Sequence, residues 1–298
     1  MEATLLTISN GELTVQINPY GATLWSIKDI VDGAEDTEYL WQGNAEYWED
    51  RAPNIFPYVG RMSNKHYTLD GKEYTMDIHG FAKDSQFEII KKQPDSVTLR
   101  LKDDEAIYAQ YPYHFVFDIT YKLEGRKLIT VFHVENQDDR AMYFGIGGHP
   151  GFHVPMEAGL EFADYYLEFE KDSQPKRICF SANGLVEGQP VPYQLKDGNK
   201  LPLYHSMFDD DAIVLKDLEL KVTLKSDKGS KAVRVESPDM TYLGFWHTDC
   251  TDAPFVCIEP WGALPSREGV VEDLATQPGL IKLEVGAVYD NVWSIEIL

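Results

Sequence analysis

The chain has 298 residues, of which 43% are hydrophobic and 26% charged, and its formal net charge is -22 at pH 7. The first two values are ordinary for a globular protein, whereas the charge repels nucleic-acid phosphates and anionic lipids, so we expect neither as a partner. The cysteines are odd in number and contain no Cys-x-x-Cys pair, which argues against a disulfide framework and a zinc site. Buried, reduced thiols are therefore expected at Cys179, Cys250 and Cys257.

Signals for membrane insertion or export are not found in the sequence. No run approaches the roughly eighteen consecutive apolar residues that a membrane-spanning helix needs. The first residues do not combine a basic segment with a long apolar run, so a signal peptide is not expected. We therefore expect a cytoplasmic location.

Alternation of apolar and polar residues with a period of two dominates the first half of the chain. Asn10-Gly11 separates two strand-like runs, and this dipeptide is a strong signal for a two-residue hairpin turn. Short helices are expected over 45–50 and 105–111. The clearest hairpin follows, because apolar residues alternate over 115–123 and again over 128–134 on either side of Glu-Gly-Arg.

The second half repeats this pattern. Strands are predicted over 218–224 and 232–235, around an Asp-Lys-Gly-Ser turn, and over 281–285 and 292–297 near the end. No linker, low-complexity tract or fixed-period repeat divides the chain. Many short strands with few helices predict an all-β fold, in which 1–298 form one domain, a large antiparallel β-sandwich with a broad open face for a site.

Two stretches of the first half place polar side chains where an ordinary strand would not. In 54–61, Pro57 interrupts a strand-forming run that ends in Gly-Arg, which indicates an edge or loop that presents the Arg61 guanidinium. An arginine on a solvated rim is the alternative. In 77–81, a glycine after His79 would let the backbone approach a ligand closely while the imidazole points into a cleft. A purely structural histidine is the alternative there.

Two later stretches are equally unusual. The stretch 144–152 has four glycines and a proline around His149, which argues against a strand interior and, without a following helix, against a phosphate-binding loop. We interpret it as a loop that positions His149. In 255–261, Glu259 interrupts an apolar strand, and burial would raise its pKa and make it a stronger base. A structural glutamate paired with a buried arginine is the alternative.

Other kinds of site have little support. No His, Asp or Glu spacing is typical of zinc, so no metal is expected to be required, and no Gly-x-Ser-x-Gly supports a serine hydrolase. Among the remaining histidines, His153 and His247 lie near the unusual stretches and are further candidates for the site.

The four stretches, in this order, resemble the aldose 1-epimerase family, whose fold is the galactose mutarotase-like β-sandwich, or supersandwich. The residues that carry the resemblance are the Asn-to-Gly-Arg segment 54–61, the Tyr-x-Leu-Asp-Gly-x-x-Tyr hairpin 67–74, the His-Gly pair at 79–80, His149, and Glu259 before Pro260. The likeness extends over essentially the whole chain. It implies an isomerase that interconverts the α and β anomers of an aldose without a cofactor.

The resemblance also implies roles for the acid and the base. Glu259 would take the proton of the anomeric hydroxyl as general base, and His149 would protonate the ring oxygen as general acid. Rotation about the C1–C2 bond and reclosure would then give the other anomer. Such groups each contribute roughly 10²–10⁴-fold. An ionised Glu259 and a protonated His149 are expected, with a bell-shaped pH profile.

The binding residues follow from the same resemblance. Arg61 and His79 would bind sugar oxygens, and an aspartate in the segment 208–214 would bond a sugar hydroxyl, with Asp210 and Asp211 both fitting. Trp246 would stack on the apolar face of the sugar ring, or belong to the core.

Departures from the family pattern leave the sugar open. Gly-His-Pro-Gly at 148–151 replaces Asn-His-Ser-Tyr, and one glycine instead of two follows His79, which points to the LacX-like branch. Hexose-6-phosphate 1-epimerases share the fold but need further basic residues, and only Arg51 and Lys83 stand near the motifs. A non-catalytic carbohydrate sensor is the other alternative, whereas a glycoside hydrolase lacks an evident second carboxylate. The expected partners are a small-molecule sugar and, as an open option, a second copy of the chain.

Overall fold

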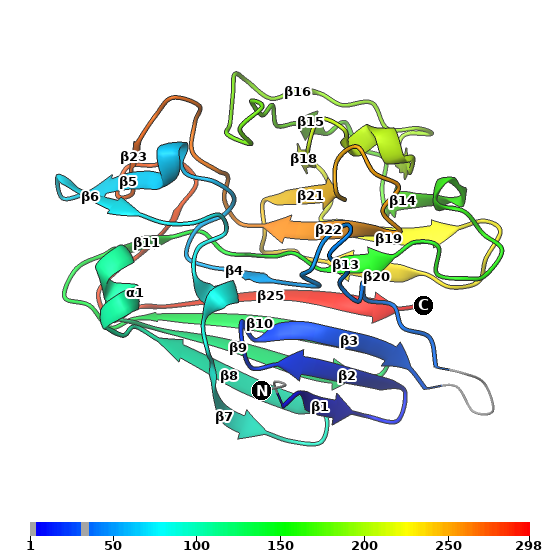
Figure 1. The fold of residues 1–298 in the computed structure, drawn as a ribbon, viewed down its shortest axis with the longest axis horizontal. Coiled ribbons are helices and arrows are strands. Elements are labelled where there is room, and N and C mark those ends of the chain that lie inside the picture. The colour runs from blue at the N-terminus through cyan, green and yellow to red at the C-terminus, as the bar shows by residue number, and fades with distance from the viewer. Residues whose placement is uncertain (1–3, 31–35) are drawn as a thin grey trace.

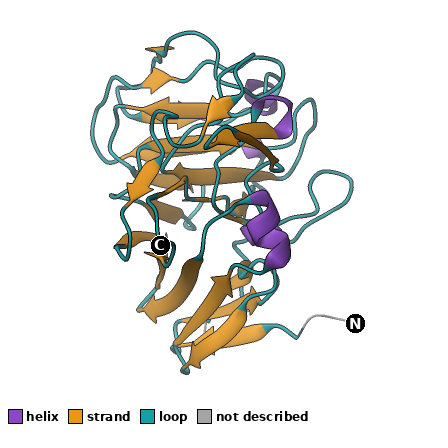
Figure 2. Cartoon of the chain, turned by 90° about the vertical axis from the view of Figure 1, so that its left-hand side faces the viewer, coloured by secondary structure: helices purple, strands orange, loops and turns teal. Residues whose placement is uncertain are grey.

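The computed structural model describes residues 4–30 and 36–298, and strands dominate it (Figure 1). Turned by 90°, the sheets stack as layers with few helical turns (Figure 2). The all-β prediction is thereby confirmed. The helical elements are α1 (Glu105–Gln110) and four short 3₁₀ turns, η1 (Ser63–Lys65), η2 (Ala82–Asp84), η3 (Phe162–Asp164) and η4 (His205–Phe208). Within the described ranges, no helix has the length and apolarity to span a membrane.

The largest sheet has nine antiparallel strands in the order β17-β14-β19-β20-β25-β10-β9-β8-β7. Their bounds are β7 Glu88–Lys92, β8 Ser96–Lys102, β9 Phe115–Glu124, β10 Lys127–Asn136, β14 Tyr165–Phe169, β17 Lys200–Pro202, β19 Lys221–Ser226, β20 Val233–Glu236 and β25 Val288–Ile297. The predicted hairpins β9–β10 and β19–β20 are both present. Their alternation places every second side chain in the core, as a period of two requires.

The second large sheet has eight strands, with seven in the order β16-β15-β18-β21-β22-β12-β4 and β13 also paired with β22. Their bounds are β4 Asn54–Ile55, β12 Gly147–Gly148, β13 Gly151–His153, β15 Lys176–Arg177, β16 Val191–Pro192, β18 Ile213–Lys216, β21 Tyr242–Trp246 and β22 Phe255–Trp261. One face of this sheet contributes Val256 and Ile258 to the same core as the nine-stranded sheet, so the two sheets form the sandwich.

Three small sheets complete the fold. They are β1 (Leu6–Ser9), β2 (Leu13–Asn18) and β3 (Thr23–Asp29); β11 (Met142–Phe144) and β24 (Ile281–Leu283); and β5 (His66–Leu69), β6 (Lys72–Thr75) and β23 (Glu272–Asp273). The predicted Asn10-Gly11 turn joins β1 to β2, and the predicted hairpin 67–74 is β5–β6.

Two expectations are wrong. No helix forms over 45–50, where a tight turn is closed by an Asn44–Trp48 bridge, whereas the helix predicted over 105–111 forms as α1. The Asn44 carboxamide accepts the Glu46 N–H at 2.9 Å, so this side chain fixes a turn in place of a helix. Of the three thiols expected to be buried, only Cys257 is, because Cys250 is exposed and Cys179 is half-buried.

Candidate active site

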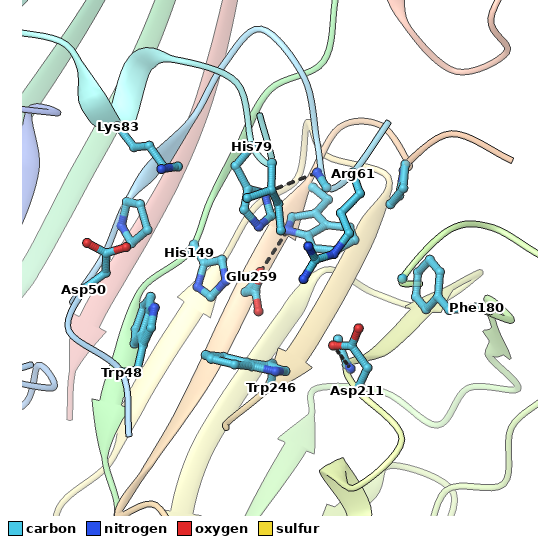
Figure 3. A pocket seen from close by; sticks show the side chains of 17 residues that line it. Trp48, Asp50, Arg61, His79, Lys83, His149, Phe180, Asp211, Trp246 and Glu259 are labelled. Atoms are coloured by element: carbon cyan, nitrogen blue, oxygen red, sulfur yellow. Dashed lines mark hydrogen bonds and ion pairs between the residues drawn. The ribbon is translucent and has the colours of Figure 1, made fainter. Parts of the chain in front are cut away.

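A cavity of about 240 Å³ opens on the face of the eight-stranded sheet that points away from the main core (Figure 3). Its side chains come from segments far apart in the sequence, which the short strands β4, β12, β21 and β22 bring side by side. Of the seven residues given a catalytic or binding role from the sequence, six line it: Arg61, His79, His149, Asp211, Trp246 and Glu259.

Glu259 reaches the cavity because alternation along β22 turns Glu259 and Trp261 to this face while Ile258 faces the core. The Glu259 side chain is 1% exposed. Its Oε2 accepts a hydrogen bond from Trp261 Nε1 at 3.1 Å and lies 3.1 Å from His149 Nε2. Its Oε1 has no hydrogen-bond partner among the described residues, so this oxygen is free to receive a proton from a ligand.

His149 lies between β12 and β13 and is held by its backbone, whose N–H donates to Pro53 O at 3.1 Å. The glycines before it form a short strand and not the loop that the sequence suggested. A Cβ at Gly147 would lie 2.8 Å from Pro260 O, and a Cβ at Gly148 would lie 2.8 Å from a Trp293 ring carbon. Glycine is therefore required because neighbouring strands approach closely, which the count of glycines alone does not reveal.

Burial controls the protonation of the His149–Glu259 pair. It raises the pKa of the Glu259 carboxyl well above its ordinary value, which the Trp261 hydrogen bond opposes and the Asp211 charge assists. It lowers the pKa of the His149 imidazole to about 4. Both shifts favour the uncharged form of each group, in which the pair shares one proton. The expected state, an ionised Glu259 beside a protonated His149, contains the same single proton and stays a prediction, which these two shifts oppose.

His79 presents one defined nitrogen to the cavity. Its backbone has φ +64°, and the Gly60 N–H donates to His79 Nδ1 at 3.2 Å. Because Nδ1 accepts, the neutral ring bears its proton on Nε2, which can donate to a ligand oxygen. Burial, assisted by the nearby His149, lowers the pKa of His79 well below its ordinary value and keeps the ring neutral.

Arg61, Asp211 and Trp246 also line the cavity, and Trp246 lies next to His149 and Glu259 (Figure 3). Arg61 is exposed and forms no ion pair with the residues that the structure describes, so its guanidinium is available to a ligand. Of the two aspartates left open, Asp211 lines the cavity with its φ at +74°, whereas Asp210 is exposed and lies outside the lining.

Several lining residues were not found from the sequence. Trp48 and Asp50 arrive from the turn that was expected to be a helix, and Phe180 comes from a segment that was not singled out. Trp261 ends the unusual stretch 255–261, in which only Glu259 was given a role. The one signal in the sequence is that Trp48 and Asp50 lie a few residues before the stretch 54–61. That proximity does not reveal whether their side chains point into a cavity. Lys83, noted only as a basic residue near the motifs, also lines the cavity.

Other candidates lie elsewhere. His153 packs edge-on against Trp41, and His247 is buried and hydrogen-bonded to His205 at 3.2 Å, so neither lines the cavity. Arg51 donates to Gln42 and Trp25 and stacks on the Trp25 ring at 3.9 Å. Of the two basic residues noted near the motifs, only Lys83 is therefore in the wall, where it pairs with Asp84.

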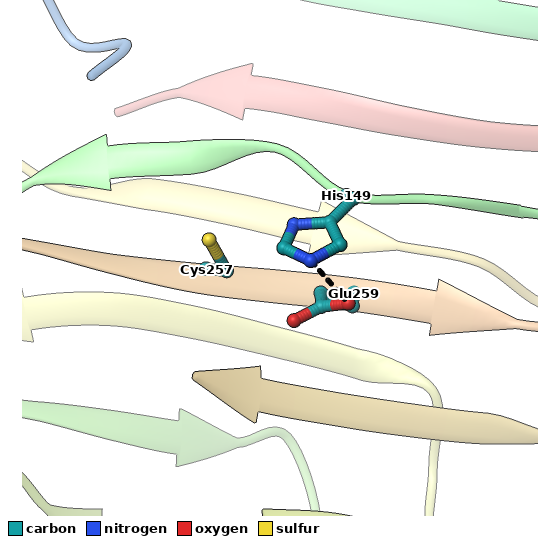
Figure 4. Close-up of side chains that lie close together, drawn as sticks. All are labelled: His149, Cys257 and Glu259. Atoms are coloured by element: carbon teal, nitrogen blue, oxygen red, sulfur yellow. Dashed lines mark ion pairs between the residues drawn. The ribbon is translucent and has the colours of Figure 1, made fainter. Parts of the chain in front are cut away.

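His149, Cys257 and Glu259 bring three potential metal ligands within 4.8 Å of one another (Figure 4). Zinc binds a thiolate, so binding here would require loss of the thiol proton. Burial and the adjacent Glu259 raise the pKa of the Cys257 thiol well above its ordinary value. We therefore interpret the cluster as an acid–base pair beside a protonated thiol. That no metal is required stays a prediction.

Comparison with known proteins gives consistent matches. The aldose 1-epimerase family model matches residues 4–272. Chromosomal protein LacX of Lactococcus lactis subsp. lactis is 35% identical over 281 residues, which cover 90% of this chain and 92% of LacX.

Solved structures match over the full length. A galactose mutarotase related enzyme from Lactobacillus acidophilus superposes with a TM-score of 0.92 at 32% identity, covering 99% of this chain and 97% of that one. A galactose mutarotase-like protein from Lactobacillus casei ATCC 334 has the same TM-score at 30% identity, covering 99% and 100%. The predicted galactose mutarotase-like fold and LacX-like relationship are thereby confirmed.

Proposed function

Since this chain belongs to the aldose 1-epimerase family, we propose that it interconverts the α and β anomers of an aldose by opening and reclosing the hemiacetal ring. One observation carries the proposal: His149 Nε2 and Glu259 Oε2 lie 3.1 Å apart in the wall of a cavity. Because the anomeric oxygen and the ring oxygen are bonded to the same carbon, one acid and one base this close can reach both.

The proton count of the pair suits this reaction. To open the ring, the pair's proton first passes from Glu259 Oε2 to His149 Nε2, 3.1 Å away. The Glu259 carboxylate then removes the anomeric hydroxyl proton while His149 gives its proton to the ring oxygen. The C1–O5 bond breaks, the carbonyl forms, and the pair is left as a neutral acid and a neutral imidazole. This is the state that burial favours. Reclosure on the other face of the carbonyl returns each proton.

The surrounding side chains supply binding. His79 Nε2–H and the Arg61 guanidinium are donors for oxygens on which negative charge develops, and fixed donors of this kind stabilise that charge. Asp211 is an acceptor for a sugar hydroxyl. The indole of Trp246 offers an aromatic surface for the apolar face of the ring.

A free aldose is favoured over a sugar 6-phosphate. A phosphate dianion calls for several available cations, but Arg51 lies outside the cavity lining, where it donates to Gln42 and Trp25, and Lys83 pairs with Asp84. Asp50 and Asp211 add negative charge to the wall. Arg61 is then the one lining cation without an ion pair among the described residues.

Saturation-transfer NMR or polarimetry of glucose, galactose and their 6-phosphates tests the proposal. We expect the protein to accelerate anomer exchange of a free aldose, and Glu259→Gln and His149→Asn to abolish most of the acceleration. Sugar binding without acceleration, unchanged in Glu259→Gln, would instead establish a non-catalytic sensor. Exchange of only the 6-phosphates would establish a sugar-phosphate epimerase.

A further inference from the structure

The second nitrogen of the His149 imidazole has an unusual environment. Nδ1 is buried and has no hydrogen-bond partner among the described residues. Histidines that transfer protons are commonly oriented by a carbonyl or carboxylate at their second nitrogen. Here, among the described residues, one contact at hydrogen-bonding distance joins the ring to a polar side chain, from Nε2 to Glu259 Oε2 at 3.1 Å. Packing must therefore supply the remaining orientation.

Aromatic rings provide that packing. The Trp48 indole lies 5.0 Å from the His149 ring, centroid to centroid, at an interplanar angle of 34°. Trp246 and His79 meet the imidazole nearly edge-on, at 5.7 Å and 5.3 Å with angles of 80° and 89°. Trp48 is thus, of these three rings, the one closest to parallel with the imidazole. It lies beside His149 in the close-up (Figure 3).

Trp48 is itself held firmly. Its carbonyl accepts hydrogen bonds from Asn44 N and from Trp41 Nε1, both at 2.9 Å. Its indole stacks on Phe255 at 5.6 Å and meets Trp246 edge-on at 5.5 Å. A Cβ at Gly151 would lie 3.1 Å from Trp48 Cζ3, so glycine there lets the indole approach. The turn, two rings and one glycine fix the position of the indole.

We propose that Trp48 is a positioning residue for the acid–base reaction: it orients the His149 imidazole toward Glu259 and keeps water from Nδ1. The inference rests on the proposed function. In this proposal an aromatic ring orients the imidazole, as a hydrogen-bonded carbonyl or carboxylate commonly does in other proteins. The titratable groups that face His149 are Glu259, the Cys257 thiol and His79, and Trp48 adds no charge to them.

Trp48→Ala tests the inference through the acid limb of the pH profile. The substitution admits water to Nδ1 and reduces the desolvation that holds the pKa of His149 near 4, so the limb should move up toward pH 6.5 by about one unit or more. Loss of orientation should lower kcat about 10- to 100-fold, since misplacement by about 1 Å can cost roughly 10²-fold. Trp48→Phe should restore most of both.

Tyr47→Ala is the matched control, because it removes a ring from the same turn that does not line the cavity. It should leave kcat and the limb unchanged. The inference is overturned if Trp48→Ala raises KM alone with an unmoved limb, or if Tyr47→Ala has the same effect. Should Trp48→Ala not fold, Gly151→Ala displaces the indole and must move the limb in the same direction.

NMR titration of the His149 ring in wild type and Trp48→Ala measures the same shift without any sugar. A raised imidazole pKa in Trp48→Ala supports the inference even if no aldose proves to be a substrate. An unchanged pKa overturns it, whatever the activity. Failure of the wild-type protein to accelerate any anomer exchange would instead refute the proposed function.

Discussion

The β9–β10 hairpin and the β12–β22 region are built from the same two-residue period but use it differently. In β10 the inward positions are filled by Leu128, Phe132 and Val134, which bury apolar surface against the opposite sheet. In β22 the face that points away from the core carries Glu259 at 1% exposure. The buried positions of the hairpin hold apolar side chains that stabilise the fold. Those of the site hold ionisable groups, whose charged forms burial disfavours. Substitutions should therefore separate stability from activity.

The largest effect is expected from Glu259→Gln. It keeps the volume and an acceptor for Trp261 Nε1 but removes the base, so kcat should fall about 10²–10⁴-fold. Stability should change by no more than about 1 kcal/mol, because a neutral amide replaces a carboxyl whose neutral form burial favours. Anomer exchange and urea unfolding measure the two. A loss of more than about 3 kcal/mol would make Glu259 a structural residue.

Leu128→Ala makes the complementary change in the hairpin. The side chain is fully buried, so its truncation should cost about 2–5 kcal/mol of unfolding free energy. Because Leu128 does not line the cavity, kcat of the folded protein should stay within about twofold. Urea unfolding measures the loss of stability, and anomer exchange rates at urea concentrations below the unfolding transition measure kcat of the folded variant. A fall in kcat as large as that of Glu259→Gln would contradict the claim that the hairpin contributes to stability and not to activity.

Gly148→Ala should affect both properties, because it lies where the site meets the core. The new Cβ would lie 2.8 Å from the Trp293 ring, and overpacking of this kind costs about 1–3 kcal/mol. Displacement of the adjacent His149 should also lower kcat. Gly71→Ala is the matched control, since it adds strain at φ +73° in the β5–β6 turn but contacts nothing within 4 Å. If Gly71→Ala also lowers kcat, the loss in Gly148→Ala cannot be attributed to displacement of the adjacent His149.

The neighbouring aspartates offer a smaller, paired comparison. Asp211→Asn should lower kcat/KM about tenfold. This corresponds to about 1.4 kcal/mol, as expected for loss of one hydrogen bond from a sugar hydroxyl to a charged carboxylate. Asp210→Asn should have no effect, because Asp210 is exposed outside the lining. Steady-state rates at several sugar concentrations distinguish them. Equal losses in both would place the sugar over the rim and not in the cavity.

The smallest effect is expected for mild acidification. Acid adds a second proton to the pair, at His149, whose pKa is about 4. The value of kcat should therefore stay nearly constant from pH 7 to pH 5 and fall at lower pH. At high pH the pair loses its single proton as Glu259 ionises, which gives the second limb. A pH–rate profile measures both. A midpoint near 6.5 would show that His149 is hydrated.

The sequence predicted the hairpins well because local alternation and turn residues determine them. It also pointed to His79, His149 and Glu259, since glycine or proline beside a polar residue is unusual in a strand. It could not predict that Trp48 packs on His149, because this contact depends on a turn meeting strands about a hundred residues later in the chain. Nor could it predict that burial favours the uncharged form of both groups, because the two desolvation effects arise only once both side chains share one buried space.

The most direct test of the central claim is the anomer exchange rate of the double variant Glu259→Gln/His149→Asn beside both single variants. If the two groups pass one proton between them and the sugar, removing either disables both. The double variant should then be about as slow as each single one, as for other catalytic groups that act as a unit. Multiplicative losses, or a double variant that retains the wild-type rate, would contradict a shared-proton pair.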